Sequence, residues 1–524
     1  MSAAGTAVTG GAVRRPARRP DGAAGFGRLL HAEWTKFRTV RGWVIGMLLA
    51  PALIVGVALL DHSSCGGQVT PGGPIITGQG CAAPIGPGGQ AVTDSYYLVH
   101  QSLGRDGTIT ARVTSLTSAG GPGGLPPWSK AGLIISASTR PGSAYAAMMV
   151  TAGHGVRMQY DYTGDITGLA GAVSQAAPRW LRLSRSGATI TGYDSADGVH
   201  WTKVGTVRLP GLPSTVPAGL FAASPGSSRQ VSQSITGSSA VGALSLATAR
   251  FDQVSLGGAV RGTSWTGAAV GGAAGGQGFR QEGGTFSVTG TGDIAPLVPG
   301  VSGAGAGGTD AGKTLLGAFA GLIAVIVVAS MFMTAEYRRR LITATFAATP
   351  ARGRVLAAKA TVIGGVAFAA GLAGGAVALP LGEALLRSNG NFIMPVTPQT
   401  QARLVIGTAA VLAVAAVLAL AVGTILRSGA AAITALVVTM VLPYVLATAL
   451  PVLPAPAAGW LLRVTPAAGF AVQQTLVRYP QVAAAYTPQQ GYYPLPPWAG
   501  LAVLCGFAAL AMAVAVVSLR SRDA

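Results

Sequence analysis

The segment GGTDAGKT, from Gly307 to Thr314, matches the phosphate-loop pattern GxxxxGK(S/T) at every fixed position. In that pattern a buried strand leads into a glycine-rich turn, and backbone N–H groups of the turn and the following helix hold nucleotide phosphates. Here a Ser/Gly/Ala-rich stretch precedes the segment and a long apolar run follows it. No acid after Lys313 ends an apolar strand, where a Mg²⁺ ligand would stand. We therefore interpret the match as spurious and expect no nucleotide or other cofactor.

Acidic and histidine side chains suggest no other chemistry. Calcium binding would require four turn-like segments to converge, those that contain Asp161, Asp165, Asp194 and Asp197. Solvated turn aspartates are the simpler interpretation, because aspartate is favoured in turns. The histidines show no metal-ligand spacing, and no Ser/His/Asp or Cys/His arrangement is evident. We expect no metal site and no catalysis by this chain alone.

Three cysteines are too few for a disulfide scaffold. Cys65 and Cys81 lie in a Gly/Pro-rich stretch after the first apolar run, and Cys505 lies inside the last one, where we expect a small buried hydrophobe. A bridge between Cys65 and Cys81 would contribute about 3 kcal/mol. The sequence does not show whether their Cα atoms come within about 7 Å, so bridged and free thiols both remain open.

The composition favours a membrane protein, because half of the 524 residues are hydrophobic and only 10% are charged. The net charge of +20 does not gather on an aromatic-rich face as in nucleic-acid-binding proteins. Basic residues instead flank the apolar runs, first before residue 42 and again between residues 338 and 359. Since basic loops stay on the cytoplasmic side, both termini are predicted to be cytoplasmic and the number of spans even.

The pattern of the chain divides it into a helical membrane part and an inserted β-rich part. Residues 1–25 read as a disordered basic tail, and 26–42 as an interfacial amphipathic helix. Residues 43–60 form the first predicted transmembrane helix, and helices two to six lie within 313–520, with an outer loop at 451–496. GLAGG, at residues 371–375, has the small-residue spacing of a helix contact.

Residues 61–312 are predicted to be extracytoplasmic. A Gly/Pro-rich loop at 61–91 leads to short strand-like segments over 92–298, with a core at 92–258, and a Gly-rich linker at 299–312. Turn residues separate segments such as KAGLIISAS, RWLRLSRSG and ARFDQVSL. The expected fold class is therefore an α-helical membrane protein of about six spans with an inserted all-β jelly-roll or sandwich domain.

Three segments of the membrane part resemble the permease subunits of type-2 ABC exporters: HAEWTKFRTVRGW, EYRRRLITATFAATPARGRVLAAK and WLLRVTPAAGFAVQQT. The resemblance covers residues 26–60 and 313–520. It implies a cytoplasmic coupling segment at 336–356 that contacts a separate ATPase subunit, and an outer loop that enters the outer leaflet. The implied contact residues are Glu336, Arg338, Arg339, Arg340, Arg352 and Arg354.

Residues 92–258 are similar to concanavalin-A-like or laminin-G-like sandwiches in RWLRLSRSG, YDSADGVHW and ARFDQVSL, which implies a lectin-like domain able to bind glycan or peptide. We therefore expect a plasma-membrane permease subunit that exports an apolar or amphipathic cargo, as a homodimer or with a second permease. The alternative is a non-transporting, membrane-anchored surface protein whose sandwich binds glycan or peptide. A tethered glycosidase would need two carboxylates about 5 to 10 Å apart, and no such pair is evident.

Overall fold

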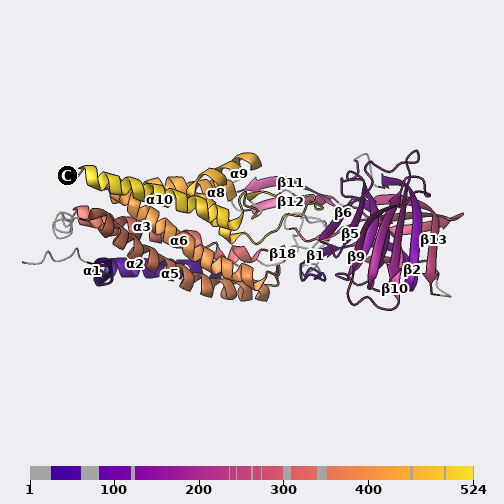
Figure 1. The fold of residues 1–524 in the computed structure, drawn as a ribbon, viewed down its shortest axis with the longest axis horizontal. Helices are drawn as coiled ribbons and strands as arrows, with labels where there is room; N and C mark the ends of the chain where they lie inside the picture. The colour runs from indigo at the N-terminus through magenta and orange to yellow at the C-terminus, as the bar shows by residue number, and fades with distance from the viewer. Residues whose placement is uncertain are drawn as a thin grey trace, which may run out of the picture.

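The computed structural model describes residues 25–60, 82–119, 124–234, 237–243, 245–260, 264–272, 274–298, 308–338, 351–448, 453–484, 486–488 and 491–522. Helices occupy one end of the elongated molecule and strands the other (Figure 1). The strands from Val92 to Pro296 lie between the first and second long helices in the sequence, as expected of an inserted β-rich part.

Among the described residues, six helices are long and apolar enough to cross a membrane by length and composition, as the apolar runs predicted. They are α2 (Arg41–Leu59), α3 (Ala318–Arg338) with the preceding 3₁₀ turn η1 (Ala311–Leu315), α5 (Arg352–Ser388), α6 (Pro398–Leu426), the broken helix α7–η2–α8 (Gly429–Leu436, Val437–Val441 and Leu442–Thr448), and α10 (Pro497–Arg522). A seventh helix, α1 (Phe26–Thr39), begins where the interfacial helix was predicted. Between α8 and α10 the chain forms α9 (Ala455–Val464) and the 3₁₀ helix η3 (Pro466–Gln473).

Small residues let the helices approach closely. An added Cβ at Gly371 of α5 would lie 2.8 Å from the Cα atom of Ala409 in α6, a distance that real Cβ atoms do not show. Gly321 of α3 and Gly374 of α5 lie against Ile54 of α2, where an added Cβ would come within 2.8 Å of the isoleucine side chain. The helix contact predicted for residues 371–375 is therefore confirmed, and close backbone approach explains why glycine is needed there.

The strands form a large, antiparallel and nearly closed sheet. Its strands are β2 (Tyr96–Ser118), β3 (Lys130–Ser136), β4 (Tyr145–Thr151), β5 (Val156–Tyr160), β6 (Gly164–Thr167), β7 (Arg179–Ser186), β8 (Thr189–Ser195), β9 (Thr202–Arg208), β10 (Val216–Ala223), β13 (Ala247–Ala259), β14 (Thr266–Val270), β15 (Gly278–Glu282) and β16 (Thr285–Gly290). Small two-stranded sheets pair β1 (Val92–Asp94) with β17 (Ile294–Pro296), β11 (Ser227–Ser234) with β12 (Gly237–Ala243), and β18 (Gly308–Thr309) with β19 (Phe392–Ile393).

The long strand β2 gives the sheet its shape. Its first half pairs with β10 and β14, whereas its second half pairs with β13 and β7. Side chains of one face, such as Leu133, Leu181 and Phe251, form a common core. Both faces of β3 and β4 are buried, since Ile134 and Tyr145 on the other face pack against β1 and β17.

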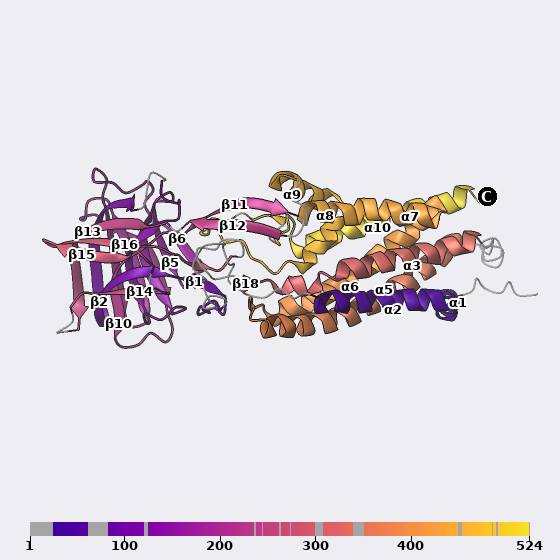
Figure 2. The ribbon, with the colours of Figure 1, turned by 180° about the vertical axis from the view of Figure 1, so that it is seen from behind.

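The β-rich part contacts the segment that joins η3 to α10. The side-chain amide of Gln481 donates hydrogen bonds to the backbone oxygens of Tyr162 and Thr163, each at 3.3 Å. Ala295 and Val298, just after the sheet, pack with Leu476, Val482 and Tyr492 of that segment. Figure 2 shows the strands and helices meeting through this narrow region.

Asp94 makes the stability of the β-rich part depend on pH. Burial raises its carboxyl pKa from 3.8 to about 6, although hydrogen bonds from the Tyr162 hydroxyl and the Gly142 N–H oppose the shift. The folded state thus retains a proton that the unfolded chain releases. The contribution of this carboxyl to stability is therefore most favourable below about pH 4 and is lost as the pH rises through about 6.

We expect this carboxyl to lower the free energy of unfolding by about 3 kcal/mol between roughly pH 4 and pH 7. Urea unfolding of the full-length protein in detergent, followed by circular dichroism, measures the slope. Asp94→Asn should show a flatter dependence on pH, and Glu282→Gln, at an exposed site on β15, should keep the wild-type dependence. Equal slopes in all three proteins would contradict the assignment.

Candidate functional site

Four charged side chains meet at the end of the helical part that lies away from the sheet. Glu33 and Lys36 come from α1, Glu336 from the last turn of α3, and Lys359 from the second turn of α5. Glu33 and Phe37 are the buried residues of α1, and their spacing of four places both on the face that meets the other helices. We call these four residues the charge cluster.

Every member of the charge cluster has a partner of opposite charge. The Lys359 ammonium lies 2.6 Å from Glu33 Oε2 and 2.7 Å from Glu336 Oε1. The Lys36 ammonium lies 2.8 Å from Glu33 Oε1 and 3.1 Å from Glu336 Oε1. Two acids and two lysines sum to zero formal charge, which suits a site with little access to water.

Burial makes the inner three charges strongly dependent on each other. The Lys359 side chain is 1% exposed and the two glutamates 4% and 7%, whereas Lys36 is 38% exposed. Burial alone would lower the pKa of Lys36, but its hydrogen bond to Glu33 and the charges of Glu336 and Glu33 raise it instead. Removing one partner from such a group leaves a charge without compensation in a low-dielectric region.

Aromatic side chains hold the charge cluster in place. The Phe332 ring lies 4.8 Å from the Lys359 ammonium, close enough for a cation–π interaction. Phe37 and Trp43 pack edge-on against the same ring, at centroid distances of 6.0 and 5.0 Å. The helices α1, α2 and α3 are therefore joined by apolar contacts directly beside the ionic ones.

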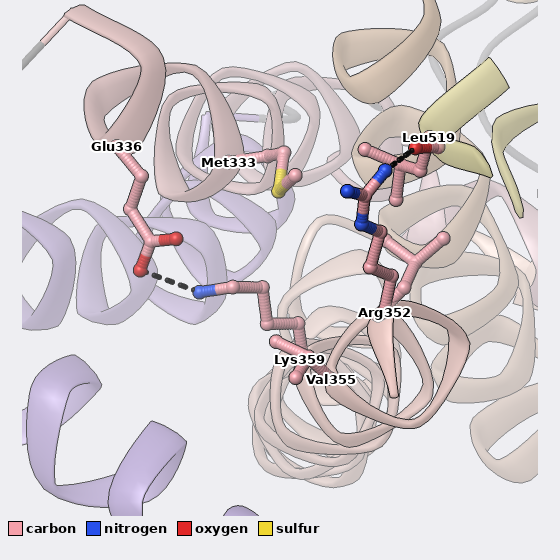
Figure 3. A pocket seen from close by; sticks show the side chains of 7 residues that line it. Met333, Glu336, Arg352, Val355, Lys359 and Leu519 are labelled. Atoms are coloured by element: carbon pink, nitrogen blue, oxygen red, sulfur yellow. Dashed lines mark hydrogen bonds and ion pairs between the residues drawn. The ribbon is translucent and has the colours of Figure 1, made fainter. Parts of the chain in front are cut away.

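A small cavity borders the charge cluster (Figure 3). Its volume of about 10 Å³ is close to that of one water molecule, and Glu336 and Lys359 lie on one side of it. Arg352, from the first turn of α5, lies on the other side and donates to the Leu519 backbone oxygen of α10 at 2.5 Å. Polar contacts thus tie together the ends of α1, α3, α5 and α10.

The predicted ATPase contact residues fall into two groups. Arg338 and Arg354 are exposed on either side of the connection from α3 to α5, whereas Arg339 and Arg340 lie outside the described residues. Glu336 is buried in the charge cluster, and Arg352 is half-buried beside the cavity. Among the four predicted contact residues that the structure describes, Arg338 and Arg354 are exposed and can reach another protein, while Glu336 and Arg352 make contacts within this chain.

The sequence reasoning missed Glu33 and Lys359 as members of a site. Both lie inside the segments that carry the permease resemblance, HAEWTKF and RVLAAK, and these segments meet in space with EYR. The signals were an acid and a lysine three residues apart on an otherwise apolar and basic helix, and a lysine inside an apolar run. A lysine in such a run calls for a buried acid as partner.

The segment that matches the phosphate loop is folded differently from one. Its described residues begin with the two-residue strand β18, and Asp310 then caps the short turn η1. The Asp310 carboxylate accepts hydrogen bonds from the Gly312 N–H and the Thr475 hydroxyl, so an acid of the chain occupies the start of the turn. That position would repel a phosphate.

The four turn aspartates have separate partners. Asp161 accepts from the Tyr145 N–H, Asp165 pairs with Arg157, and Asp194 accepts from the Leu169 N–H. Asp197 pairs with His200, whose hydrogen bond holds the pKa of Asp197 well below its usual range. Among the described residues, no group of three or more His, Cys, Asp or Glu is arranged to hold a metal.

The cysteines differ in what the structure shows. Cys65 and Cys81 lie outside the described residues, so the bridge between them stays a prediction. Cys505 has a free thiol and is exposed, so the expectation of a buried hydrophobe was wrong. The reason is that α10 is packed on one face only, and the apolar composition of the helix did not reveal which face.

No family model and no curated protein matches the chain. A functionally unknown protein from Saccharomyces cerevisiae shares 15% identity over 30% of this chain and 71% of its own, with a TM-score of 0.19. Scytalido-glutamic peptidase shares 8% over 39% of this chain and 100% of its own, with a TM-score of 0.25. The GH43 protein BlXynB from Bacillus licheniformis shares 14% sequence identity over 22% of this chain and 24% of its own, with a TM-score of 0.17. Similarities this weak carry no argument about function.

Lys359→Met should destabilise the helical part by about 3 to 5 kcal/mol, because Glu33 and Glu336 would face each other with only the half-exposed Lys36 between them. Lys36→Met should cost clearly less, since Lys359 still pairs with both acids. Adding Glu336→Gln to Lys359→Met should recover part of the loss through their interaction energy. Denaturant unfolding in detergent micelles measures all three, and similar losses for the two lysine variants would refute the expected ranking.

Proposed function

We propose that this chain is the membrane-spanning permease subunit of an ABC-type exporter, powered by a separate ATPase subunit. The observation that carries the proposal is the charge cluster. It joins an interfacial helix to the two spans that flank the connection at residues 339–350. A partner that moves this connection would move α3 and α5, and the buried ion pairs would carry the displacement to α1.

The proposal requires a surface for the ATPase beside the charge cluster. Arg338 ends α3 and Arg354 lies in the first turn of α5, and both are exposed. A soluble partner with acidic side chains would be attracted to them without disturbing the buried pairs. In this proposal the exposed arginines bind the ATPase, and the charge cluster transmits the movement of the ATPase to α1.

A plasma-membrane location with both termini cytoplasmic is part of the proposal. Two features support it: six helices long enough to span, and tryptophans near both ends of the helical part, as at membrane interfaces. Trp34 of α1 is 44% exposed at one end, and Trp460 of α9 and Trp498 of α10 are 61% and 58% exposed at the other. The β-rich part, which adjoins the second end, would then be extracytoplasmic.

For the β-rich part we propose a jelly-roll or sandwich domain that binds glycan or peptide and performs no chemistry. The proposal is supported by β2, which pairs with two sets of strands around one core.

The helices leave room for a second permease subunit or a second copy of this chain. In the most apolar windows of α2 and α10 only 22% of residues are buried, so most of these helices face lipid or a partner.

Charge reversal at the exposed arginines should weaken association with the ATPase. We expect the Arg338→Glu/Arg354→Glu protein, extracted in mild detergent, to retain less than about a tenth of the co-purifying ATPase. Arg520→Glu, an exposed arginine of α10, is the matched control and should retain most of it. The absence of any ATPase with the wild-type protein would overturn the exporter proposal.

Deleting residues 65–305 separates the exporter from its rival, a non-transporting surface protein. An exporter should keep vanadate-sensitive transport in proteoliposomes after the deletion, because the charge cluster and all spans remain. A surface protein should lose its entire function with the domain. Transport that is absent before and after the deletion would favour the rival.

A further inference from the structure

A cavity that the exporter proposal does not use lies beside α9, at the same end of the helical part as the sheet. Its volume is about 290 Å³, close to the lower end of the range for small-molecule sites. One wall is a single face of α9, with Gly459, Trp460 and Arg463. The other wall belongs to the segment before α10, with Arg478, Tyr486 and Tyr492.

The charge of the cavity is entirely positive. Arg463 and Arg478 are exposed, and no acid is among the described residues that line it. The outer loop at 451–496 contains these two arginines and no Asp, Glu or Lys, and Glu383 is the one acid in the sequence between residues 337 and 522. The nearest acid, Asp310, lies behind Gly491 and Tyr492 and already accepts hydrogen bonds from the Thr475 hydroxyl and the Gly312 N–H. Two cations that line one cavity favour an anionic ligand, and arginine suits phosphate through paired hydrogen bonds.

Aromatic residues make the cavity rigid. Tyr486 donates from its hydroxyl to the Tyr479 backbone oxygen at 2.8 Å and packs edge-on against the buried Tyr492 at 4.8 Å. Arg478 lies over the Tyr486 ring at 5.9 Å, and Arg463 lies over the Trp460 ring at 6.0 Å. Each guanidinium thus lies over an aromatic ring, and the ring beneath Arg478 is itself held by hydrogen bonding and packing.

Exposed apolar side chains are next in sequence to the two arginines. Val464 and Val477, next in sequence to Arg463 and Arg478, are 53% and 58% exposed, and Trp460 is exposed as well. Exposed apolar side chains near a pair of cations suit a molecule with an anionic head and an apolar tail. Exposed Trp460 and Trp498 mark this level as a membrane interface, where such molecules have their head groups.

We propose that this cavity binds the phosphate head group of an amphiphile from the outer leaflet, with Arg463 and Arg478 on the phosphate and the tail along Val464 and Val477. The inference rests on the membrane placement in the proposed function and does not require the ATPase. It assigns a ligand class to the outer loop, which the sequence indicated only as a segment that enters the leaflet.

Fluorescence quenching of Trp460 in nanodiscs tests the proposal with the full-length protein. The difference between wild type and Trp460→Phe isolates this residue from the other seven tryptophans. We expect phosphatidylglycerol with brominated chains to quench it at about tenfold lower mole fraction than brominated phosphatidylcholine, because an anionic head group can approach both arginines. Arg463→Gln/Arg478→Gln should abolish the preference, whereas Arg520→Gln, on the opposite end of α10, should keep it.

Soluble glycerol phosphate distinguishes the two sources of the same anion. No competition at millimolar concentration supports a lipid head group, and competition that requires both arginines supports a free phosphate ester as the ligand. Equal quenching by both lipids without competition, or a preference that survives in the double variant, would overturn the inference. The ATPase association is measured on the same preparation, so an intact complex without lipid preference refutes this inference alone.

Discussion

The helical part depends on the requirement that charges removed from water be paired. Lys359 is 1% exposed, and its two partners come from two other helices, Glu33 from α1 and Glu336 from α3. Their ion pairs persist only while α1, α3 and α5 keep their mutual positions. Because the cost of separation is high, these helix ends should move together when any one of them is displaced. This constraint makes the cluster suited to coupling.

Along its length, the helical part has charged side chains at one end, apolar packing in the middle and charged side chains again at the other end. The cytoplasmic end, in our proposal, has the neutral charge cluster with exposed arginines beside it. The middle is packed through glycines such as Gly371, where α5 closely approaches the backbone of α6. The other end has a cavity lined by two arginines and aromatic rings, with no acid among its described lining residues. Each end thus has exposed arginines, and we propose that those at one end bind a protein and those at the other an amphiphile.

The contact between the β-rich part and the outer loop links the two halves of the proposal. Gln481 bonds to the backbone at Tyr162, whose hydroxyl in turn donates to the buried Asp94 at 2.7 Å. The same loop contributes Arg478, Tyr486 and Tyr492 to the amphiphile cavity. A short chain of contacts therefore connects Asp94 in the β-rich part to the segment that lines that cavity.

The sequence by itself determined the apolar spans, the β-rich insertion and the glycine contact at 371–375, because length, hydropathy and alternation are local properties of the chain. It also identified the segments that form the site. Only the tertiary structure decided that Glu33 and Lys359 pair across 326 residues, that Glu336 is turned inward, and that Arg463 and Arg478 share one cavity. Such pairings depend on which helix faces meet, and near-uniform apolar helices such as α10 carry little periodic signal to predict them.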